Sequence, residues 1–158
     1  MAVREVMVLW AGRHDREPWR SLCADYEQRI AHHWRIAQRQ IRAGRGDGPE
    51  RREAEAEAML SAAPEPASLL ALDSRGRARS SESFADFLRQ TFESSPGPLV
   101  FLIGSDLGLS PDLLRTARHR ISFGPQTLPH EMARLILLEQ LYRSLAIETG
   151  IKYHRGPF

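Results

Sequence analysis

Residues 101–104 read Phe-Leu-Ile-Gly, a short apolar run that opens into the loop Ser-Asp-Leu-Gly-Leu-Ser at residues 105–110. Such a run, bounded by turn residues, is typical of a strand buried in a parallel sheet. Ser110 is followed by Pro-Asp, which predicts a serine-capped helix to about residue 117. The stretch is therefore a strand-loop-helix unit, and α/β proteins bind ligands in the loops after the carboxyl ends of such strands.

The rest of the chain repeats this alternation of strands and helices. Strands are expected at residues 4–10, 34–41, 68–72, 99–103 and 121–123, and helices at 18–30, 50–61, 83–92, 110–117 and from 129 onward. Residues 73–76 (Asp-Ser-Arg-Gly) predict a turn, and Ser81 or Ser83 is expected to cap the third helix. The pattern predicts one α/β domain over residues 1–158, with a mostly parallel sheet and helices on both faces.

Composition excludes several classes of protein. With 158 residues, of which 42% are hydrophobic and 27% charged, the chain has the make-up of an ordinary soluble domain. No run is long enough for a membrane span or for the apolar core of a signal peptide. The single cysteine, Cys23, excludes an intrachain disulfide and a multi-cysteine metal site, and its place in an apolar stripe indicates a buried thiol. A cytoplasmic protein without a metal or a membrane partner is expected.

The basic residues are almost all arginine. The net charge is only +2, and Lys152 is the one lysine among 22 basic residues. Arginines cluster in two regions, at positions Arg35, Arg39, Arg42, Arg45, Arg51 and Arg52, and at Arg115, Arg118, Arg120, Arg134, Arg143 and Arg155. Guanidinium groups bind phosphate and stack on bases, so the clusters are compatible with RNA. A solvated surface is the alternative, and charge alone favours it.

The last helix is apolar in nearly every direction between Met132 and Ile147. A helix of this kind must be buried on more than one side. One side can face the sheet, and the other most simply faces a second copy of the chain, which predicts a homodimer. A monomer that buries the helix centrally is the alternative.

Two further segments have the residue types of ligand sites. Residues 123–130 read Phe-Gly-Pro-Gln-Thr-Leu-Pro-His, in which proline and glycine fix the backbone while Phe123 and Leu128 supply apolar walls. Such a segment can read the edge of an adenine, although Thr127 could instead cap the last helix. Residues 152–155 (Lys-Tyr-His-Arg) combine side chains that can stack on a base and hold phosphate. The alternative is an ordinary disordered terminus.

As a set, these features resemble the SPOUT class of RNA methyltransferases, and most closely the RlmH-type (YbeA-like) family, which methylates N3 of a pseudouridine in 23S rRNA. The resemblance covers essentially the whole chain. Its most specific parts are Thr-Leu-Pro-His at 127–130, Leu-Tyr-Arg at 141–143 and Tyr-His-Arg at 153–155. It implies an α/β fold with a deep C-terminal trefoil knot over about residues 99–158, a homodimer, and S-adenosylmethionine as the cofactor.

The resemblance also implies the functional residues. Cofactor contacts are expected from Leu72, Gly104, Phe123, Gly124, Pro125, Gln126, Thr127 and Leu128. Catalytic roles are expected for His130, Tyr153, His154 and Arg155, and RNA contacts for Arg134, Arg143 and Arg155, with the tail reaching the site across the dimer. The family loop usually has two adjacent glycines after the strand, whereas here Ser105 follows Gly104, which puts the loop contacts beyond Gly104 in question.

The acceptor atom, N3 of the pseudouridine, determines which catalytic groups the reaction needs. A sulfonium methyl is already activated, so the protein must chiefly align it with N3, whose proton has to leave. Tyr153 and His154 are expected to position the base, Arg143 and Arg155 to hold phosphate or stabilise imide charge, and His130 to support the pocket wall. The chain has no separate RNA-binding domain, so assembled ribosomes are the expected substrate. Two alternatives stay open: a SPOUT methyltransferase acting on another RNA, such as a tRNA base or ribose, and a non-catalytic RNA- or ribosome-binding protein.

Overall fold

The structure, a computed structural model, describes residues 3–13, 15–42 and 44–153. Its sheet has five strands, β1 (Glu5–Ala11), β2 (Arg35–Ile41), β3 (Ser68–Ala78), β4 (Leu99–Ile103) and β5 (His119–Ser122). They lie in the order β2-β1-β4-β3-β5, and every neighbouring pair is parallel. The predicted α/β class with a parallel sheet is confirmed.

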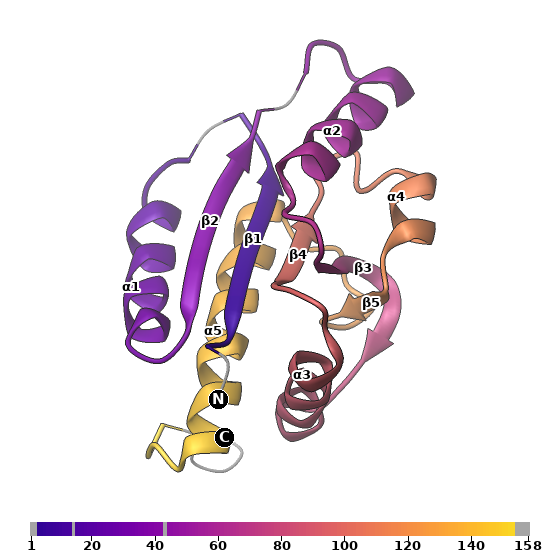
Figure 1. The fold of residues 1–158 in the computed structure, drawn as a ribbon. Helices are drawn as coiled ribbons and strands as arrows, with labels where there is room; N and C mark the ends of the chain where they lie inside the picture. Colours follow the sequence, from indigo (N-terminus) through magenta and orange to yellow (C-terminus); the bar gives the residue numbers. More distant parts are fainter. Residues whose placement is uncertain (1–2, 14, 43, 154–158) are drawn as a thin grey trace.

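Helices cover both faces of this sheet, as Figure 1 shows. They are α1 (Trp19–Ala31), α2 (Pro49–Ala62), α3 (Ser81–Ser94), α4 (Pro111–Thr116) and α5 (His130–Thr149). Alternate side chains of β1 enter different cores, because successive residues of a strand point to opposite faces. Val8 and Trp10 pack in the core formed with α1, α3 and α5, whereas Leu9 and Ala11 pack in the core formed with α2 and α4.

Helix α5 lies between α1 and α3 and runs from the carboxyl ends of the strands to their amino ends (Figure 1). Leu137, Leu138, Leu141 and Leu145 on this helix are at most 1% exposed. One chain thus already buries much of the helix that the sequence shows to be apolar all round. The outer side keeps some apolar surface, with Met132 37% exposed, and the homodimer stays a prediction.

Two local predictions were wrong. The turn expected at residues 73–76 is part of β3, which continues to Ala78; its pairing with β5 shifts register between Leu72 and Arg77, so the strand passes through an irregularity and does not end. Helix α3 is capped by Ser80 and not by Ser81 or Ser83, since the Ser80 Oγ accepts a hydrogen bond of 3.1 Å from the Ser83 backbone N–H. The serine cap of α4 is confirmed, because Ser110 Oγ accepts a 3.1 Å bond from Leu113 N–H.

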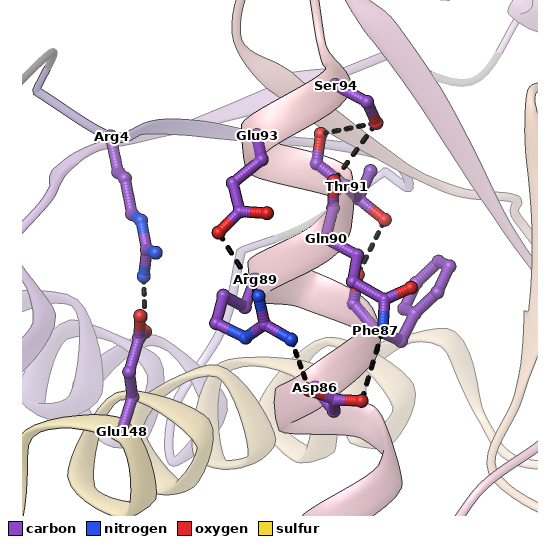
Figure 2. A network of polar contacts seen from close by, with 9 residues as sticks. All are labelled: Arg4, Asp86, Phe87, Arg89, Gln90, Thr91, Glu93, Ser94 and Glu148. Atoms are coloured by element: carbon purple, nitrogen blue, oxygen red, sulfur yellow. Dashed lines mark hydrogen bonds and ion pairs between the residues drawn. The ribbon is translucent and has the colours of Figure 1, made fainter.

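Exposed ion pairs lie along α3 and at the end of α5, as Figure 2 shows. Arg4 pairs with Glu148 in the last turn of α5, which joins the segment before β1 to the end of that helix. On α3, Arg89 lies between Asp86 at 2.7 Å and Glu93 at 3.1 Å. Pairs this exposed contribute little to stability, typically about 0.2–1 kcal/mol each.

Within the described part of the chain, no helix is long and apolar enough to span a membrane. The same residues contain no group of three or more His, Cys, Asp or Glu side chains arranged to hold a metal. Cys23 is 1% exposed, which confirms the buried thiol.

Candidate functional site

The carboxyl ends of β4 and β5 and the middle of β3, at residues 72–75, border one cavity of about 730 Å³. This volume is in the range that holds cofactor-sized ligands. Seven of the eight residues expected to contact the cofactor line it: Leu72, Gly104, Phe123, Gly124, Gln126, Thr127 and Leu128. Pro125 belongs to the same loop but is not on the cavity wall. Three segments far apart in the sequence therefore meet around one cavity.

The loop after β4 is tight enough to require glycine. A Cβ atom on Gly104 would lie 2.5 Å from the carbonyl carbon of Gly108, closer than real Cβ contacts come. Gly108 has φ +72°, a backbone conformation that favours glycine. Its N–H donates a 2.9 Å hydrogen bond to the Ser105 carbonyl. The loop thus turns back on itself beside the cavity with its backbone exposed to a ligand.

The side chain of Ser105 ties this loop to α2. Its Oγ donates a 2.8 Å hydrogen bond to Glu55 Oε2. Glu55 Oε1 lies 3.3 Å from Arg51 Nε, and the Arg51 guanidinium also contacts Asp106 and donates to the Gly46 carbonyl at 2.9 Å. Arg51 and Glu55 are 5% and 3% exposed. Serine at this position is therefore accommodated, because it gains a buried acceptor and needs no left-handed backbone.

The loop after β5 forms the opposite wall. Gly124 has φ +117°, and its N–H donates a 3.0 Å hydrogen bond to Ser122 Oγ. Phe123 packs edge-on to Phe84 of α3, with ring centroids 6.5 Å apart. Pro129 occupies the cap position of α5, and no side chain there accepts a capping hydrogen bond, so Thr127 does not cap the helix. Thr127 instead lines the cavity.

His130 stands at the junction of this cavity with a second one of about 350 Å³, since it lines both. Its ring stacks on that of Trp10, with an interplanar angle of 16° and centroids 6.5 Å apart. The guanidinium of Arg134 also lies over Trp10, 4.1 Å from the ring centroid, and donates a 2.9 Å hydrogen bond to Asp15. Arg134 is only 3% exposed, so in a single chain it supports Trp10 and does not face solvent.

Tyr153, the last described residue of the tail, lies elsewhere in the fold, beside Arg143 of α5. Tyr153 O–H donates to Glu139 Oε1 at 3.0 Å and lies 3.1 Å from Tyr26 Oη. Arg143 pairs with the same Glu139 at 2.6 Å and lies over the Tyr153 ring. Burial, together with the hydrogen bonds to Tyr26 and Glu139, raises the pKa of Tyr153 above its ordinary value. Neither Tyr153 nor Arg143 lines the cavity, and His154 and Arg155 lie outside the described residues.

The cavity residues that were not anticipated as site residues include the charged side chains of Arg52, Asp73 and Glu131. Asp73 directly follows the apolar run at residues 68–72, and an acid after such a run is a sequence signal that could have been used. Arg52 could not have been separated from Arg51 by sequence. The structure buries Arg51 and directs Arg52 to the cavity.

Comparisons with solved structures identify the architecture. The SpoU methyltransferase AviRb from Streptomyces viridochromogenes, solved in complex with AdoMet, superposes with a TM-score of 0.51 at 18% identity. The match covers 92% of this chain and 59% of AviRb, so the chain spans less than two thirds of that protein. A probable methyltransferase from Bordetella pertussis Tohama I gives a TM-score of 0.52 at 14% identity, covering 90% and 93% of the two chains. These likenesses establish a shared fold.

Sequence comparisons are more specific. The chain is 37% identical over 154 residues to the ribosomal RNA large subunit methyltransferase H of Nitratidesulfovibrio vulgaris, covering 96% of this chain and 99% of the relative. The protein of the same name from Nitrobacter winogradskyi is 38% identical over 162 residues, with the same coverage. The family model described as "Predicted SPOUT methyltransferase" matches residues 5–154. The chain therefore belongs to the SPOUT methyltransferase family.

Proposed function

We propose that this protein transfers a methyl group from S-adenosylmethionine to N3 of a pseudouridine in 23S rRNA. It would act in the cytoplasm on assembled ribosomes, as a homodimer. The observation that carries the proposal is the meeting of Leu72, Gly104 and the loop at 123–128 around one cavity, bordered by the middle of β3 and the carboxyl ends of β4 and β5. The names of the relatives, which refer to methylation of large-subunit rRNA, support the choice of substrate.

The cavity residues suit this cofactor. Leu72, Phe123 and Leu128 supply apolar walls for an adenine, and the glycine turns at Gly104 and Gly124 bring backbone amides and carbonyls close to its edge. Asp73 lies on the same wall, where a carboxylate can accept hydrogen bonds from ribose hydroxyls. When bound, the cofactor supplies an activated methyl on a sulfonium.

The rest of the reaction falls to the protein. A bond forms between the methyl carbon and N3, the carbon–sulfur bond breaks, and the N3 proton is lost. The pKa of Tyr153 is raised above its ordinary value, which makes the phenol a still weaker proton acceptor through its anion, so we assign it hydrogen-bond donation and positioning rather than proton removal. We assign His154 to positioning the base, and Arg143 and Arg155 to holding phosphate or stabilising imide charge. His130, stacked on Trp10, supports the wall between the two cavities.

The position of Tyr153 supports the proposal of a dimer. Arg143 is thirteen residues beyond His130 on α5, which is roughly 20 Å along the axis at about 1.5 Å per residue. Tyr153 packs beside Arg143 and not beside the cavity. A tail that starts this far from the cavity of its own chain can serve the cavity of a second copy. The partly exposed Met132 and the half-buried Ile136 on the outer side of α5 offer apolar surface for pairing.

We also propose that about residues 99–158 are threaded as a trefoil knot. Family membership is what supports this, since such threading is almost absent from other folds. A knotted terminus encloses the cofactor loops from two sides and would hold the 104–110 and 123–130 loops in fixed register.

The substrate is tested in cells that lack the gene. Mass spectrometry of 23S rRNA from the deletion strain is expected to show one pseudouridine without its N3 methyl, restored by the wild-type gene. Loss of a methyl from a tRNA base or a ribose instead would reassign the substrate. An unchanged modification profile, combined with no calorimetric binding of S-adenosylmethionine at millimolar concentration, would favour a non-catalytic RNA-binding protein.

A further inference from the structure

Many arginines of this protein are held in ion pairs on helices or in the core, such as Arg51 with Glu55 and Arg89 with Asp86. Arg13, Arg42 and Arg45 differ: all three are exposed, and none has an acidic side chain within ion-pair distance among the residues that the structure covers. Three uncompensated guanidinium groups therefore remain available to an external anion.

These three arginines gather in one place. They line a hollow of about 540 Å³ whose other walls are Gln40, Gly44 and Gly46, and no acid among the described residues lines it. The hollow lies where β1 and β2 end side by side. Its base is rigid, because Gln40 Nε2 donates a 2.8 Å hydrogen bond to the Gly12 carbonyl and Gly12 N–H donates at 3.1 Å to the Ile41 carbonyl.

A third cavity shares lining residues with both the hollow and the cofactor cavity. Arg13 lines both the hollow and the 350 Å³ cavity beside it. That middle cavity shares Ser105, Asp106, His130 and Glu131 with the 730 Å³ cavity. The three cavities are therefore neighbours: His130 lines the cofactor cavity and the middle one, and Arg13 lines the middle one and the hollow.

We propose that Arg13, Arg42 and Arg45 bind the phosphate backbone of the RNA next to the nucleotide that is methylated. Guanidinium groups bind phosphate oxygens in bidentate fashion, and clustering three of them without an acid is favourable only when an anion neutralises them. Phosphate contacts fix the register of the RNA, so that the target base enters the middle cavity and meets the methyl donor. The inference rests on the proposed function and adds to it the surface that holds the substrate.

The double variant R42Q/R45Q tests the hollow without touching either inner cavity. Binding is measured by fluorescence anisotropy over a range of salt concentrations, with a large-subunit rRNA fragment and with a random-sequence RNA of equal length. The slope of log K against log salt is expected to fall by about two, roughly one for each arginine that no longer binds a phosphate. The weakening is expected for both RNAs, because phosphate contacts do not read sequence. The KM for rRNA is expected to rise at least tenfold, with S-adenosylmethionine affinity unchanged.

The matched control is R35Q/R89Q, which removes the same charge elsewhere. Arg35 begins β2 at the end of the strand opposite the hollow, and Arg89 lies on α3 (Figures 1 and 2). An equal fall in slope for the control would show that only net charge matters and would overturn the proposal. An unchanged slope for R42Q/R45Q, or a wild-type protein that binds neither RNA, would also overturn it. If the slope falls for R42Q/R45Q alone while the wild type methylates no large-subunit rRNA, the proposed substrate fails but the phosphate site stands.

Discussion

Ser105 and Glu55 are joined by a 2.8 Å hydrogen bond that connects the loop after β4 to helix α2. The bond matters because Glu55 is 3% exposed and shares its carboxylate with Arg51, which is equally enclosed. The loop that forms one wall of the cavity is thereby attached to a buried ion pair. The position of the cofactor loop thus depends on residues some fifty positions earlier in the chain.

Glu55→Ala is expected to lower the free energy of unfolding by about 3 kcal/mol, because it leaves Arg51 buried without its carboxylate partner on the same helix. Ser105→Ala removes one hydrogen bond to a charged group and is expected to cost about 2 kcal/mol. Denaturant unfolding measures both, and calorimetry is expected to show weaker S-adenosylmethionine binding in each. Glu57→Ala, an exposed change on the same helix, is the control and should fall within about 0.5 kcal/mol of wild type. Equal stability and cofactor affinity in the Glu55 and Glu57 variants would contradict this role.

Gly104→Ala is expected to abolish cofactor binding while leaving a folded protein. The added Cβ would lie 2.5 Å from the Gly108 backbone, so the loop must open. Gly48→Ala serves as the control, since nothing lies within 4 Å of a Cβ there; it should bind S-adenosylmethionine like wild type, with at most a small loss of stability from the altered cap of α2. Unimpaired binding by Gly104→Ala would show that the loop does not form the pocket wall.

His154→Ala is expected to keep cofactor affinity and to lose turnover, because the residue is assigned to the acceptor and not to the donor. Mixing this variant with Gly104→Ala tests whether the tail acts across a dimer. Half of the dimers formed at random combine both variants, and each has one site with an intact pocket and an intact partner tail. About a quarter of wild-type activity should therefore return after refolding the two together. No recovery, from variants shown to exchange subunits, would mean that the tail serves its own chain.

The raised pKa of Tyr153 predicts a pH dependence of stability. A group whose pKa is higher in the folded state favours folding below its unfolded pKa and loses that contribution as pH rises toward the folded value. For a tyrosine the loss begins above about pH 10. Ultraviolet titration should show one of the three tyrosines ionising late, and Tyr153→Phe should remove that late step. Three tyrosines that titrate together in the folded wild type would contradict the burial of this phenol.

Much of the framework is legible in the sequence. Strands β1, β3 and β4 contain short apolar runs that are buried, and Ser110-Pro111 marks a helix start by its chemistry alone. Residues 73–76 misled because Asp-Ser-Arg-Gly favours a turn locally, while pairing with β5 keeps the backbone extended past an irregularity. The order of the strands could not be predicted from the sequence, because no local pattern indicates that β1 lies between β2 and β4.

The arginines show why charge alone does not reveal function. Arg51 and Arg52 are adjacent, yet one is enclosed in an ion pair and the other faces the cavity. Arg134, expected to contact RNA, lies buried over Trp10 with Asp15 as its partner. Arg13, by contrast, becomes a candidate for phosphate binding only because the ends of β1 and β2 bring it beside Arg42. Burial and tertiary neighbours decide among these roles, and neither is encoded within a short window of sequence.

The central claim is methyl transfer to one base of large-subunit rRNA. The most direct test supplies labelled S-adenosylmethionine with free 23S rRNA, isolated large subunits or whole ribosomes, all prepared from cells lacking the gene, and maps the product by mass spectrometry. We expect a single N3-methylated pseudouridine, formed fastest on assembled particles. Label in none of the three substrates, or a methyl on any other nucleotide, would contradict the account.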